Sequence, residues 1–373
     1  MILLSKFCIL IVALKTLLQD LSLEKLQDVL QKIGAPKFRA AQIFAWINKG
    51  VSLGDMGNIP KELKEKLAGS SGEFIDYVLR IVKVVKASDG TEKYLYKLHD
   101  GEFIEGVFLP NNYGNTLCVS TQVGCRMGCV FCNSGENALL RNLSAGEIAG
   151  QFIAATNRRK KIASGNAASN SNKNDKDKPI TNIVFMGSGE PLDNYDNTIA
   201  AIKLLTDSGG INLSVRNISV STCGLVPQIL QLANEGLGIT LSLSLHAIND
   251  TVRQNIMPIA KKYSIDETIK ALKTYFEKTG RRVCIEYALV EGKNDSAQDA
   301  KKLAQLLRGF PTHVNLISLN SARGGALKGS GQKGTNAFKA TLEEQNISTS
   351  TRRSQGSEIL GACGQLRGKA LKE

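Results

Sequence analysis

Three cysteines in the segment GCRMGCVFCNSG have a spacing suited to metal chemistry. Cys125, Cys129 and Cys132 form a C-x3-C-x2-C pattern directly after a predicted strand. Such a loop can deliver three thiolates to one point but supplies no fourth. Structural zinc takes four protein ligands, whereas a [4Fe–4S] cluster can accept three thiolates and leave one iron open to a substrate. The spacing therefore predicts a catalytic iron–sulfur cluster, with a zinc knuckle and three fortuitously buried cysteines as the alternatives.

The triad, with Phe131 just before its last cysteine, resembles the radical S-adenosylmethionine (SAM) superfamily. There, the open iron binds the amine and carboxylate of the methionine moiety, and reduction of the cluster cleaves the sulfonium to a 5'-deoxyadenosyl radical. Other segments narrow the match: GSGEPLDNYDN at 187–197, STCGLVP at 221–227, SLHAINDTVRQNIMPI at 244–259 and ACGQLRGK at 362–369. Together they resemble the dual-specificity RNA methyltransferases, which methylate C2 of an adenosine in 23S rRNA and in a transfer RNA anticodon loop.

This resemblance implies a SAM site at positions that follow predicted strands. Gly189 would permit close backbone approach, and Glu190 would receive the methionine ammonium. Hydroxyl, imidazole and amide groups would address the ribose, the adenine and the carboxylate. The remaining positions implied for this site are Ser221, Ser244, Leu245, His246 and Asn320. A polar residue at a strand end is more often a cap or turn former, but the agreement across four strands favours one site.

Two further cysteines carry chemistry by the same resemblance. The C2 carbon of adenine is electrophilic, so Cys363 would accept a methyl group first, and a radical from a second SAM would activate that group for addition to C2. Cys118 would then release the product by forming a disulfide with Cys363. Turnover would require an electron donor for the cluster and a disulfide reductant.

The residues around these cysteines leave other interpretations open. Taken alone, Cys118 on its β-rich run indicates a buried structural thiol, whereas Gly361 and Gly364 indicate a mobile, accessible loop around Cys363. We interpret Cys8, Cys223 and Cys284 as core residues.

Glu105 is the proton acceptor at C2 that the resemblance implies. In GEFIEGVFLP it shares an alternating strand face with Phe103, Val107 and Leu109, so its carboxylate needs a partner if that face is buried. Without the resemblance, Glu105 would be interpreted as an exposed charge on an edge strand.

Short apolar runs alternate with amphipathic helical segments from residue 94 onward, which is typical of βα units. The six candidate strands are TLCVSTQ, NIVFM, NISVS, ITLSLSLH, VCIEYALV and VNLISLN. Ser144 with Glu147 and Ser264 with Glu267 fit the capping box, and Gly280 fits a helix end. We therefore predict an α/β fold, a partial (βα)6 radical-SAM barrel whose reactive face lies at the carboxyl ends of its strands.

A small helical accessory domain precedes this barrel. Ser22 is a candidate N-cap, Gly34 a candidate stop, and PKFRAAQIFAWINKG at 36–50 predicts a second amphipathic helix. We expect residues 1 to about 90 to be mostly helical.

We predict three parts of the chain. They are an RNA-binding accessory domain at 1–93, the barrel at 94–340 and a segment at 341–373 that carries the reactive cysteine. Residues 157–178 are interpreted as a polar, basic loop within the barrel, and 321–373 as a basic, loop-dominated segment.

The chain has 373 residues, 42% of them hydrophobic, and a net charge of +13. This composition predicts a globular protein with a polyanionic partner, led by nucleic acid. RNA contacts are expected at Lys37, Arg39, Arg352 and Arg353, and the RNA partners would be 23S rRNA and tRNA. The apolar run at 7–14 is too short to span a bilayer, so we expect a cytoplasmic protein without membrane association.

Two rival functions remain at this point. A sibling enzyme that methylates C8 of adenine uses the same cysteine chemistry. A member of a different class, a non-catalytic RNA-binding module braced by a metal, would bind RNA without consuming a cofactor.

Overall fold

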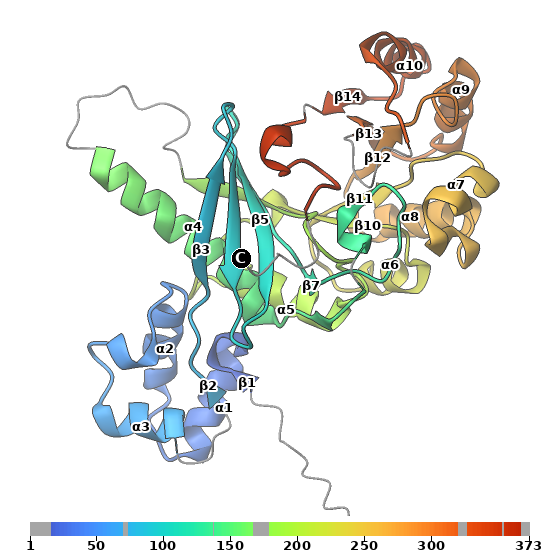
Figure 1. The fold of residues 1–373 in the computed structure, drawn as a ribbon. Helices are drawn as coiled ribbons and strands as arrows, with labels where there is room; N and C mark the ends of the chain where they lie inside the picture. The colour runs from blue at the N-terminus through green and yellow to red at the C-terminus, as the bar shows by residue number, and fades with distance from the viewer. Residues whose placement is uncertain are drawn as a thin grey trace, which may run out of the picture.

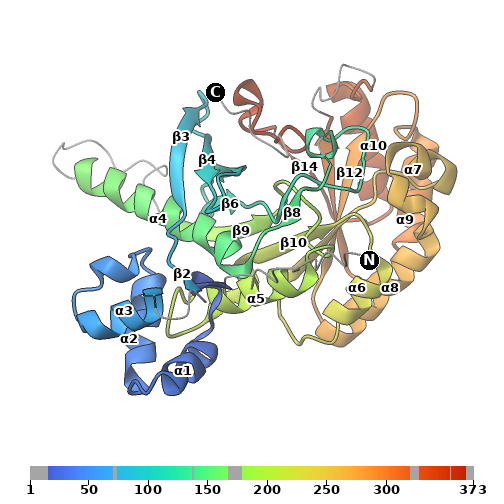
Figure 2. The ribbon, with the colours of Figure 1, turned by 60° about the horizontal axis from the view of Figure 1, so that its bottom comes forward.

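A ten-stranded mixed sheet forms the frame of the molecule, with strand order β14-β13-β12-β11-β10-β9-β6-β5-β4-β3 (Figures 1 and 2). The structure, a computed structural model, describes residues 16–69, 74–136, 138–166, 179–319, 327–352 and 354–366. Because β14 and β3 stand at opposite ends of the strand order, the sheet does not close on itself. This confirms the predicted α/β partial barrel.

The strands from β14 to β6 in this order all run parallel. They are β6 (Asn115–Cys118), β9 (Ile180–Phe185), β10 (Ile218–Thr222), β11 (Thr240–Ser244), β12 (Val283–Leu289), β13 (Thr312–Ser318) and β14 (Thr349–Arg352). The six predicted strands correspond to β6 and to β9, β10, β11, β12 and β13, and β14 is an additional edge strand. Since the strands are parallel, their carboxyl ends share one edge, where the predicted site residues lie.

Helices connect the parallel strands and lie outside the sheet (Figure 1). They are α4 (Ala145–Asn166), α5 (Tyr195–Thr206), α6 (Val226–Leu232), α7 (Asp250–Ile256), α8 (Ile265–Thr279), α9 (Ala297–Leu306) and α10 (Gln332–Glu344). Tyr287 of β12 stacks on Phe338 of α10 with ring centroids 5.4 Å apart. Both are buried, and each such side chain contributes about 1.5–3 kcal/mol to folding.

The predicted helix signals are confirmed. Ser264 and Glu267 form a reciprocal capping box at the start of α8, and Gly280 ends the helix in the left-handed conformation. At the start of α4, Glu147 N donates to Ser144 Oγ (3.2 Å), and Ser144 N donates to Glu147 Oε2 (3.0 Å).

An antiparallel unit extends the sheet beyond β6. It comprises β3 (Arg80–Lys86), β4 (Glu92–Lys97) and β5 (Phe103–Leu109). We expected residues up to about 90 to be mostly helical, and this is wrong for β3. Its RIVKVVK sequence combines β-branched residues with exposed basic ones, as is typical of an edge strand. β5 is an interior strand, so the edge-strand interpretation of Glu105 is also wrong.

The residues before β3 form a lobe of helices beside the sheet (Figure 1). It contains β1 (Thr16–Leu17), η1 (Leu18–Asp20), α1 (Leu23–Lys32), α2 (Phe38–Ile47), η2 (Leu53–Asp55), α3 (Lys61–Gly69) and β2 (Phe74–Ile75). As predicted, Ser22 caps α1 by accepting from Lys25 N, and Gly34 follows its end with φ 71°. Buried side chains of α1 and α2 belong to the same hydrophobic core as the barrel.

Two expected loops contain regular structure. Residues 157–166 continue α4, because Arg158 and Arg159 pair with Glu92 of β4 (3.0 and 3.7 Å) and so hold this polar turn against the sheet. The rest of the predicted basic loop, 167–178, lies outside the described residues. In the segment from 321 onward, α10 and β14 replace the expected loop.

The two expected domain boundaries fall inside elements of the structure. Residue 93 lies in β4 and residue 340 lies in α10. None of the described helices is long and apolar enough to cross a membrane, and the apolar run at 7–14 lies outside the described residues.

Candidate active site

The cysteine loop leaves the sheet at β6 and returns through a short antiparallel pair. β7 (Gln122–Val123) pairs with β8 (Arg141–Asn142), and η3 (Asn133–Gly135) lies within the loop. All three cysteines of the triad line one cavity at the carboxyl ends of the parallel strands. We call this the inner cavity; Gly189, Glu190, Ser221, Ser244 and His246 also line it. The structure thus brings the triad and most of the predicted SAM residues together.

The thiol groups of the triad are not arranged around a single ion. Among the described residues, no three His, Cys, Asp or Glu side chains are arranged to hold one metal ion. The cysteines of a [4Fe–4S] cluster bind three different irons, so they stand further apart than ligands that share one ion. Burial raises the pKa of Cys125 to about 12, and burial with the neighbouring thiols raises that of Cys129 as well. Thiolates here need nearby positive charge, which iron would supply.

Glu190 is fixed in the wall of the inner cavity. Its carboxylate accepts hydrogen bonds from Cys223 N (2.8 Å) and Leu192 N (3.1 Å), and burial raises its pKa. Gly189 precedes it with φ +101°, and a Cβ there would lie 2.6 Å from Cβ of Gln122. Close contact with the strand that enters the cysteine loop therefore requires glycine at this position.

Ser221, Ser244 and His246 line the inner cavity from two neighbouring strands. The Ser221 and Ser244 hydroxyls are 3.5 Å apart. His246 has φ 54°, and its Nδ1 accepts a hydrogen bond from Ala288 N (2.9 Å). A neutral ring that accepts at Nδ1 carries its proton on Nε2, which leaves a donor on the other side of the ring. Burial, together with Arg253, lowers the pKa of His246 to about 3, so the ring stays neutral.

The loop that carries Cys363 is docked on the cysteine loop. Asn133 N donates to Gly364 O (2.8 Å), Asn133 Nδ2 to Gln365 O (3.2 Å), and Ser134 Oγ to Leu366 O (2.8 Å). Cys363 itself is exposed, as predicted. The residues that follow it are anchored, however. Glycine at 364 allows the backbone to pass close to Phe131 O, so it does not indicate a mobile loop.

Cys363 and Cys118 meet at a second cavity of about 520 Å³, which we call the outer cavity. Cys118 ends β6 and is buried beside Val107 and Leu366. Burial, with a contribution from Cys363, raises the pKa of Cys118 to about 12. Cys363 lines both the inner and the outer cavity.

Glu105 lies on the strand beside Cys118. Val107 faces Cys118 in the register of β5 and β6, and Glu105 stands two residues earlier on the same face. Its carboxylate is buried and forms an ion pair with Lys93 of β4 (3.0 Å). Glu105 is therefore near the outer cavity but does not line it.

Some predicted positions fall elsewhere. Leu245 is fully buried in the core, where its carbonyl accepts from Arg253 Nε (3.0 Å), and it does not line the inner cavity. Asn320 and Arg353 lie outside the described residues. Cys223, interpreted as a core residue, is buried but also lines the inner cavity, whereas Cys284 is half-buried on β12.

The sequence analysis missed an ion pair between the two cavities. Arg352, expected on a basic loop, ends β14 and lines both cavities; its Nη1 lies 3.2 Å from Glu286 Oε2. Burial opposes its charge, but Glu286 and the nearby cysteines outweigh this and raise the pKa of Arg352. Asn315 Nδ2 donates to the other oxygen of Glu286 (2.9 Å). An acidic residue inside the apolar run VCIEYALV was the signal that could have identified Glu286.

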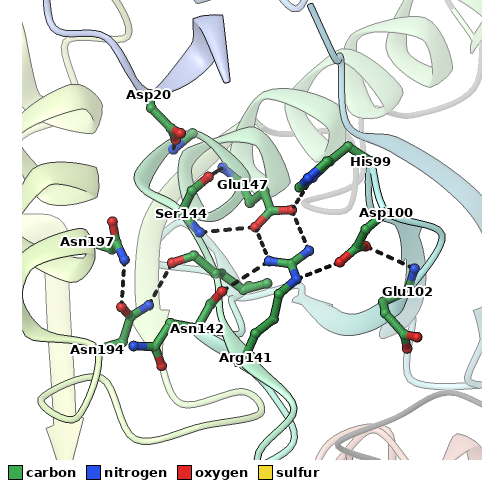
Figure 3. A network of polar contacts seen from close by, with 12 residues as sticks. Asp20, His99, Asp100, Glu102, Arg141, Asn142, Ser144, Glu147, Asn194 and Asn197 are labelled. Carbon is green, nitrogen blue, oxygen red and sulfur yellow. Dashed lines mark hydrogen bonds and ion pairs between the residues drawn. The ribbon is translucent and has the colours of Figure 1, made fainter. Parts of the chain in front are cut away.

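A polar network anchors the return of the cysteine loop (Figure 3). Arg141 of β8 binds both carboxylate oxygens of Glu147 (2.7 and 2.9 Å) and also Asp100 (2.6 Å). His99 Nδ1 lies 3.0 Å from Glu147 Oε1. Asn194, just before α5, donates to Leu143 O (2.8 Å). The network joins β8, α4, the β4–β5 turn and the start of α5.

Two family patterns match this chain. Residues 119–306 match the radical SAM superfamily, and residues 16–71 match the ribosomal RNA large subunit methyltransferase N-terminal domain. The first range contains the cysteine triad and most of the inner cavity, and the second contains the N-terminal helices.

Known proteins resemble this chain over nearly its whole length. It is 44% identical over 356 residues to the probable dual-specificity RNA methyltransferase RlmN of Alkaliphilus oremlandii, covering 95% of this chain and 98% of that protein. For the Clostridium novyi protein of the same description, identity is 43% over 350 residues, with 93% and 96% covered. The crystal structure of a radical SAM methyltransferase from Sphaerobacter thermophilus superposes with a TM-score of 0.86 at 40% identity, covering 95% of this chain and 99% of that one. The chain therefore belongs to the RlmN family of dual-specificity RNA methyltransferases within the radical SAM superfamily.

Proposed function

We propose that the protein methylates C2 of adenine in 23S rRNA and in tRNA, through an S-methylcysteine at Cys363 and a covalent protein–RNA adduct. The position of Cys363 is the observation that carries this proposal. It lines the inner cavity with the cysteine triad and the outer cavity with Cys118. One thiol thus faces both the side where the methyl donor would bind and the side where the target base would enter.

The cofactors follow from the triad and the family. A [4Fe–4S] cluster on Cys125, Cys129 and Cys132 would hold SAM at its open iron and supply the electron that splits the sulfonium to a 5'-deoxyadenosyl radical. Two SAM molecules are used per turnover, one as methyl donor and one as radical source. Glu190 would receive the methionine ammonium.

The other polar groups of the inner cavity would orient the nucleoside of SAM. The Ser221 and Ser244 hydroxyls would bind its ribose, and the Nε2–H group of His246 would donate to its adenine or carboxylate. Asn320 completes this set by resemblance alone.

Cys363 carries the methyl group between the two cavities. As a thiolate it attacks the methyl group of the first SAM, and S-adenosylhomocysteine leaves. The S-methyl group then loses one hydrogen atom to the radical from the second SAM. The resulting thiomethylene radical adds to C2 of the base, which is extruded from its RNA stack into the outer cavity.

Glu105 and Cys118 complete the reaction. To restore the aromatic ring, the C2 proton would pass to Glu105, and one electron would return to the iron–sulfur cluster, which was oxidised when it split the second SAM. Cys118 then attacks the sulfur of Cys363, the bond from that sulfur to the methylene carbon breaks, and the carbon takes up a proton to become the product methyl group. The Cys118–Cys363 disulfide remains and needs two electrons from a reductant before the next cycle.

The proposed partners are 23S rRNA, tRNA, an electron-donor protein for the cluster and a disulfide reductant. An enzyme with these substrates acts in the cytoplasm. RNA would contact the N-terminal helices, where Lys37 is exposed at the start of α2 and no acidic residue lies in the first turn of that helix.

The decisive experiment uses anaerobically reconstituted protein, RNA and SAM labelled in its methyl group. Cys118→Ala is expected to accumulate label in a covalent protein–RNA adduct that maps to Cys363. Cys284→Ala, which removes a thiol outside both cavities, should release methylated RNA as the wild type does. Freely released product from Cys118→Ala at the wild-type rate would overturn the proposed tether.

Substrates deuterated at C2 or at C8 separate the proposed activity from its C8 sibling. Loss of deuterium only from C2 supports the proposal, and loss only from C8 assigns the sibling activity. RNA binding without any consumption of SAM would instead assign the non-catalytic module.

A further inference from the structure

Arg253 of α7 is a fully buried arginine within the SLHAINDTVRQNIMPI segment. Its Nε donates to Leu245 O (3.0 Å), and its Nη2 donates to Cys223 O (2.7 Å) and Ser244 O (3.2 Å). Its Nη1 is buried and has no hydrogen-bond partner among the described residues. The side chain therefore ties the ends of β10 and β11 together and still has one donor unused.

Among the described residues, no carboxylate forms a direct ion pair with Arg253, although the charge of Asp250 on the same helix favours the charged guanidinium from further away. Two other arginines that are largely shielded from solvent do form such a pair. Arg159 pairs with Glu92, and Arg141 binds both carboxylate oxygens of Glu147. A buried guanidinium is costly unless an anion and hydrogen bonds compensate it. Three backbone carbonyls satisfy part of its hydrogen-bonding capacity but supply no negative charge.

Arg253 lies behind the wall of the inner cavity. Its backbone partner Cys223 lines that cavity, and its charge interacts with Cys129 and His246, which also line it, as well as with Asp250, which does not. The helix that carries it also holds the cysteine loop, because Val130 N donates to Ile256 O (3.0 Å). An anion bound in the inner cavity would therefore add to the compensation that Asp250 gives this buried charge.

We propose that Arg253 is the counter-charge of the iron–sulfur cluster, acting from behind the wall of the cavity whose triad would hold that cluster. This inference rests on the cluster assigned under the proposed function. Three thiolates give such a cluster a net negative charge that grows on reduction, which is the charge that a buried guanidinium lacks. Arg253 is a positioning residue in this role, since it acts on the reaction through the cluster.

The proposal has an electrochemical consequence. A fixed positive charge stabilises the reduced state of an iron–sulfur cluster. Loss of the charge should therefore make the cluster harder to reduce. A purely structural arginine, which only ties β10 to β11, would leave the midpoint potential unchanged.

The test compares three variants in the reconstituted, oxygen-free holoprotein. Arg253→Met removes the charge and the donors, Arg253→Gln keeps donors without charge, and Arg253→Lys keeps the charge. Arg159→Met is the matched control, because it removes a buried arginine that already has a carboxylate partner away from the cavity. The readouts are the midpoint potential from a redox titration followed by electron paramagnetic resonance, and the melting temperatures with and without the cluster.

We expect the midpoint potential to become more negative in Arg253→Met and Arg253→Gln, and to stay near the wild-type value in Arg253→Lys and Arg159→Met. Cluster insertion should raise the melting temperature of the wild type more than that of Arg253→Met. Equal potentials and equal cluster-dependent stabilisation across the series would overturn the inference. If Arg253→Met does not fold, Arg253→Gln and Arg253→Lys still decide between charge and structure. A wild-type protein that binds no cluster would refute the proposed function instead.

Discussion

His246 has an unfavourable backbone conformation that places its side chain in the inner cavity. Its φ of 54° is rare for a residue with a Cβ, and the ring is buried next to Phe131 in edge-to-face contact, with centroids 4.9 Å apart. Such strain persists where the surroundings fix it, as Ala288 N does here by donating to Nδ1. The result is a neutral imidazole with a fixed tautomer in the inner cavity.

The neutral state of His246 predicts a pH dependence of stability in the cluster-free protein. In the unfolded chain the ring takes up a proton near pH 6.5, whereas burial holds its folded pKa at about 3. Between these values the unfolded state binds more protons, so stability falls as the pH falls, by about 1.4 kcal/mol per pH unit from this group. Chemical denaturation at pH 7.5, 6.0 and 5.0 measures the effect. His246→Asn should reduce the slope by that amount, and an identical slope in both proteins would contradict the assignment.

The residues that sequence patterns identified are those with an unusual local signature. The cysteine spacing and the glycine-rich turns of GSGEP and ACGQL are visible without a structure. Glu286 and Arg253 were missed, because each lies in an otherwise apolar or helical segment and acquires its role only through partners thirty or more residues away, such as Arg352 and Cys223.

At the scale of elements, the reactive loop depends on the cysteine loop for its position. Gly364 has φ +80°, and a Cβ there would lie 3.2 Å from Phe131 O. Gly364→Ala should therefore strain the backbone by about 1–2 kcal/mol and shift Cys363 away from the inner cavity. Mass spectrometry of anaerobically isolated protein should find Cys363 methylated to a smaller extent. Gly334→Ala in α10, where a Cβ would make only ordinary contact with Ser330 (3.5 Å), should retain wild-type methylation, and equal methylation in Gly364→Ala would refute the role of the turn.

The network around Glu147 predicts a large stability effect from a single charge (Figure 3). Glu147 is almost fully buried, caps α4 and binds Arg141 through both oxygens. Glu147→Gln should lower the free energy of unfolding by about 2 kcal/mol. The loss is smaller than for a fully buried ion pair, because Arg141 is partly exposed and still pairs with Asp100 in the variant. Glu65→Gln, which breaks an exposed pair with Lys61, should change it by less than about 0.5 kcal/mol. Similar values for the two variants, from urea denaturation, would contradict this account.

Local signals identified elements better than long-range pairing did. The capping boxes of α4 and α8 and the βα alternation depend on neighbouring residues, and they were read correctly from the sequence. The assignment of β3 failed because its partner β4 supplies the hydrogen bonds that make it a strand, and no local motif records that pairing. The end of α4 was missed for a similar reason, since Glu92 holds its basic turn from another element.

At the scale of the whole molecule, one hydrophobic core joins the N-terminal helices to the barrel, so the two parts present a continuous structure to an RNA. Asp20 of η1 accepts a hydrogen bond from Gly146 N at the start of α4 (2.6 Å). This bond fixes the N-terminal helices against α4, the helix that follows the cysteine loop. The proposed reactive cysteine, cofactor residues and RNA surface therefore come from segments that span more than 300 residues of the chain.

A charge-reversal experiment tests this arrangement. Lys37 and Lys49 are exposed at the two ends of α2, and Lys49 lies over the Trp46 ring, 5.0 Å from its centroid. Lys301 and Lys302 are equally exposed on α9, across the molecule from α2 (Figure 1). If RNA phosphates contact the N-terminal helices, Lys37→Glu with Lys49→Glu should weaken RNA binding by about tenfold and reduce the slope of log K against log salt by about 1–2.

The control is Lys301→Glu with Lys302→Glu, which changes the net charge by the same amount. It separates a local contact from the general attraction of RNA to a chain with charge +13. Filter binding between 50 and 200 mM salt measures both quantities. If both double variants lose the same affinity and the same slope, the attraction is due to net charge, and the N-terminal helices are not part of the RNA interface.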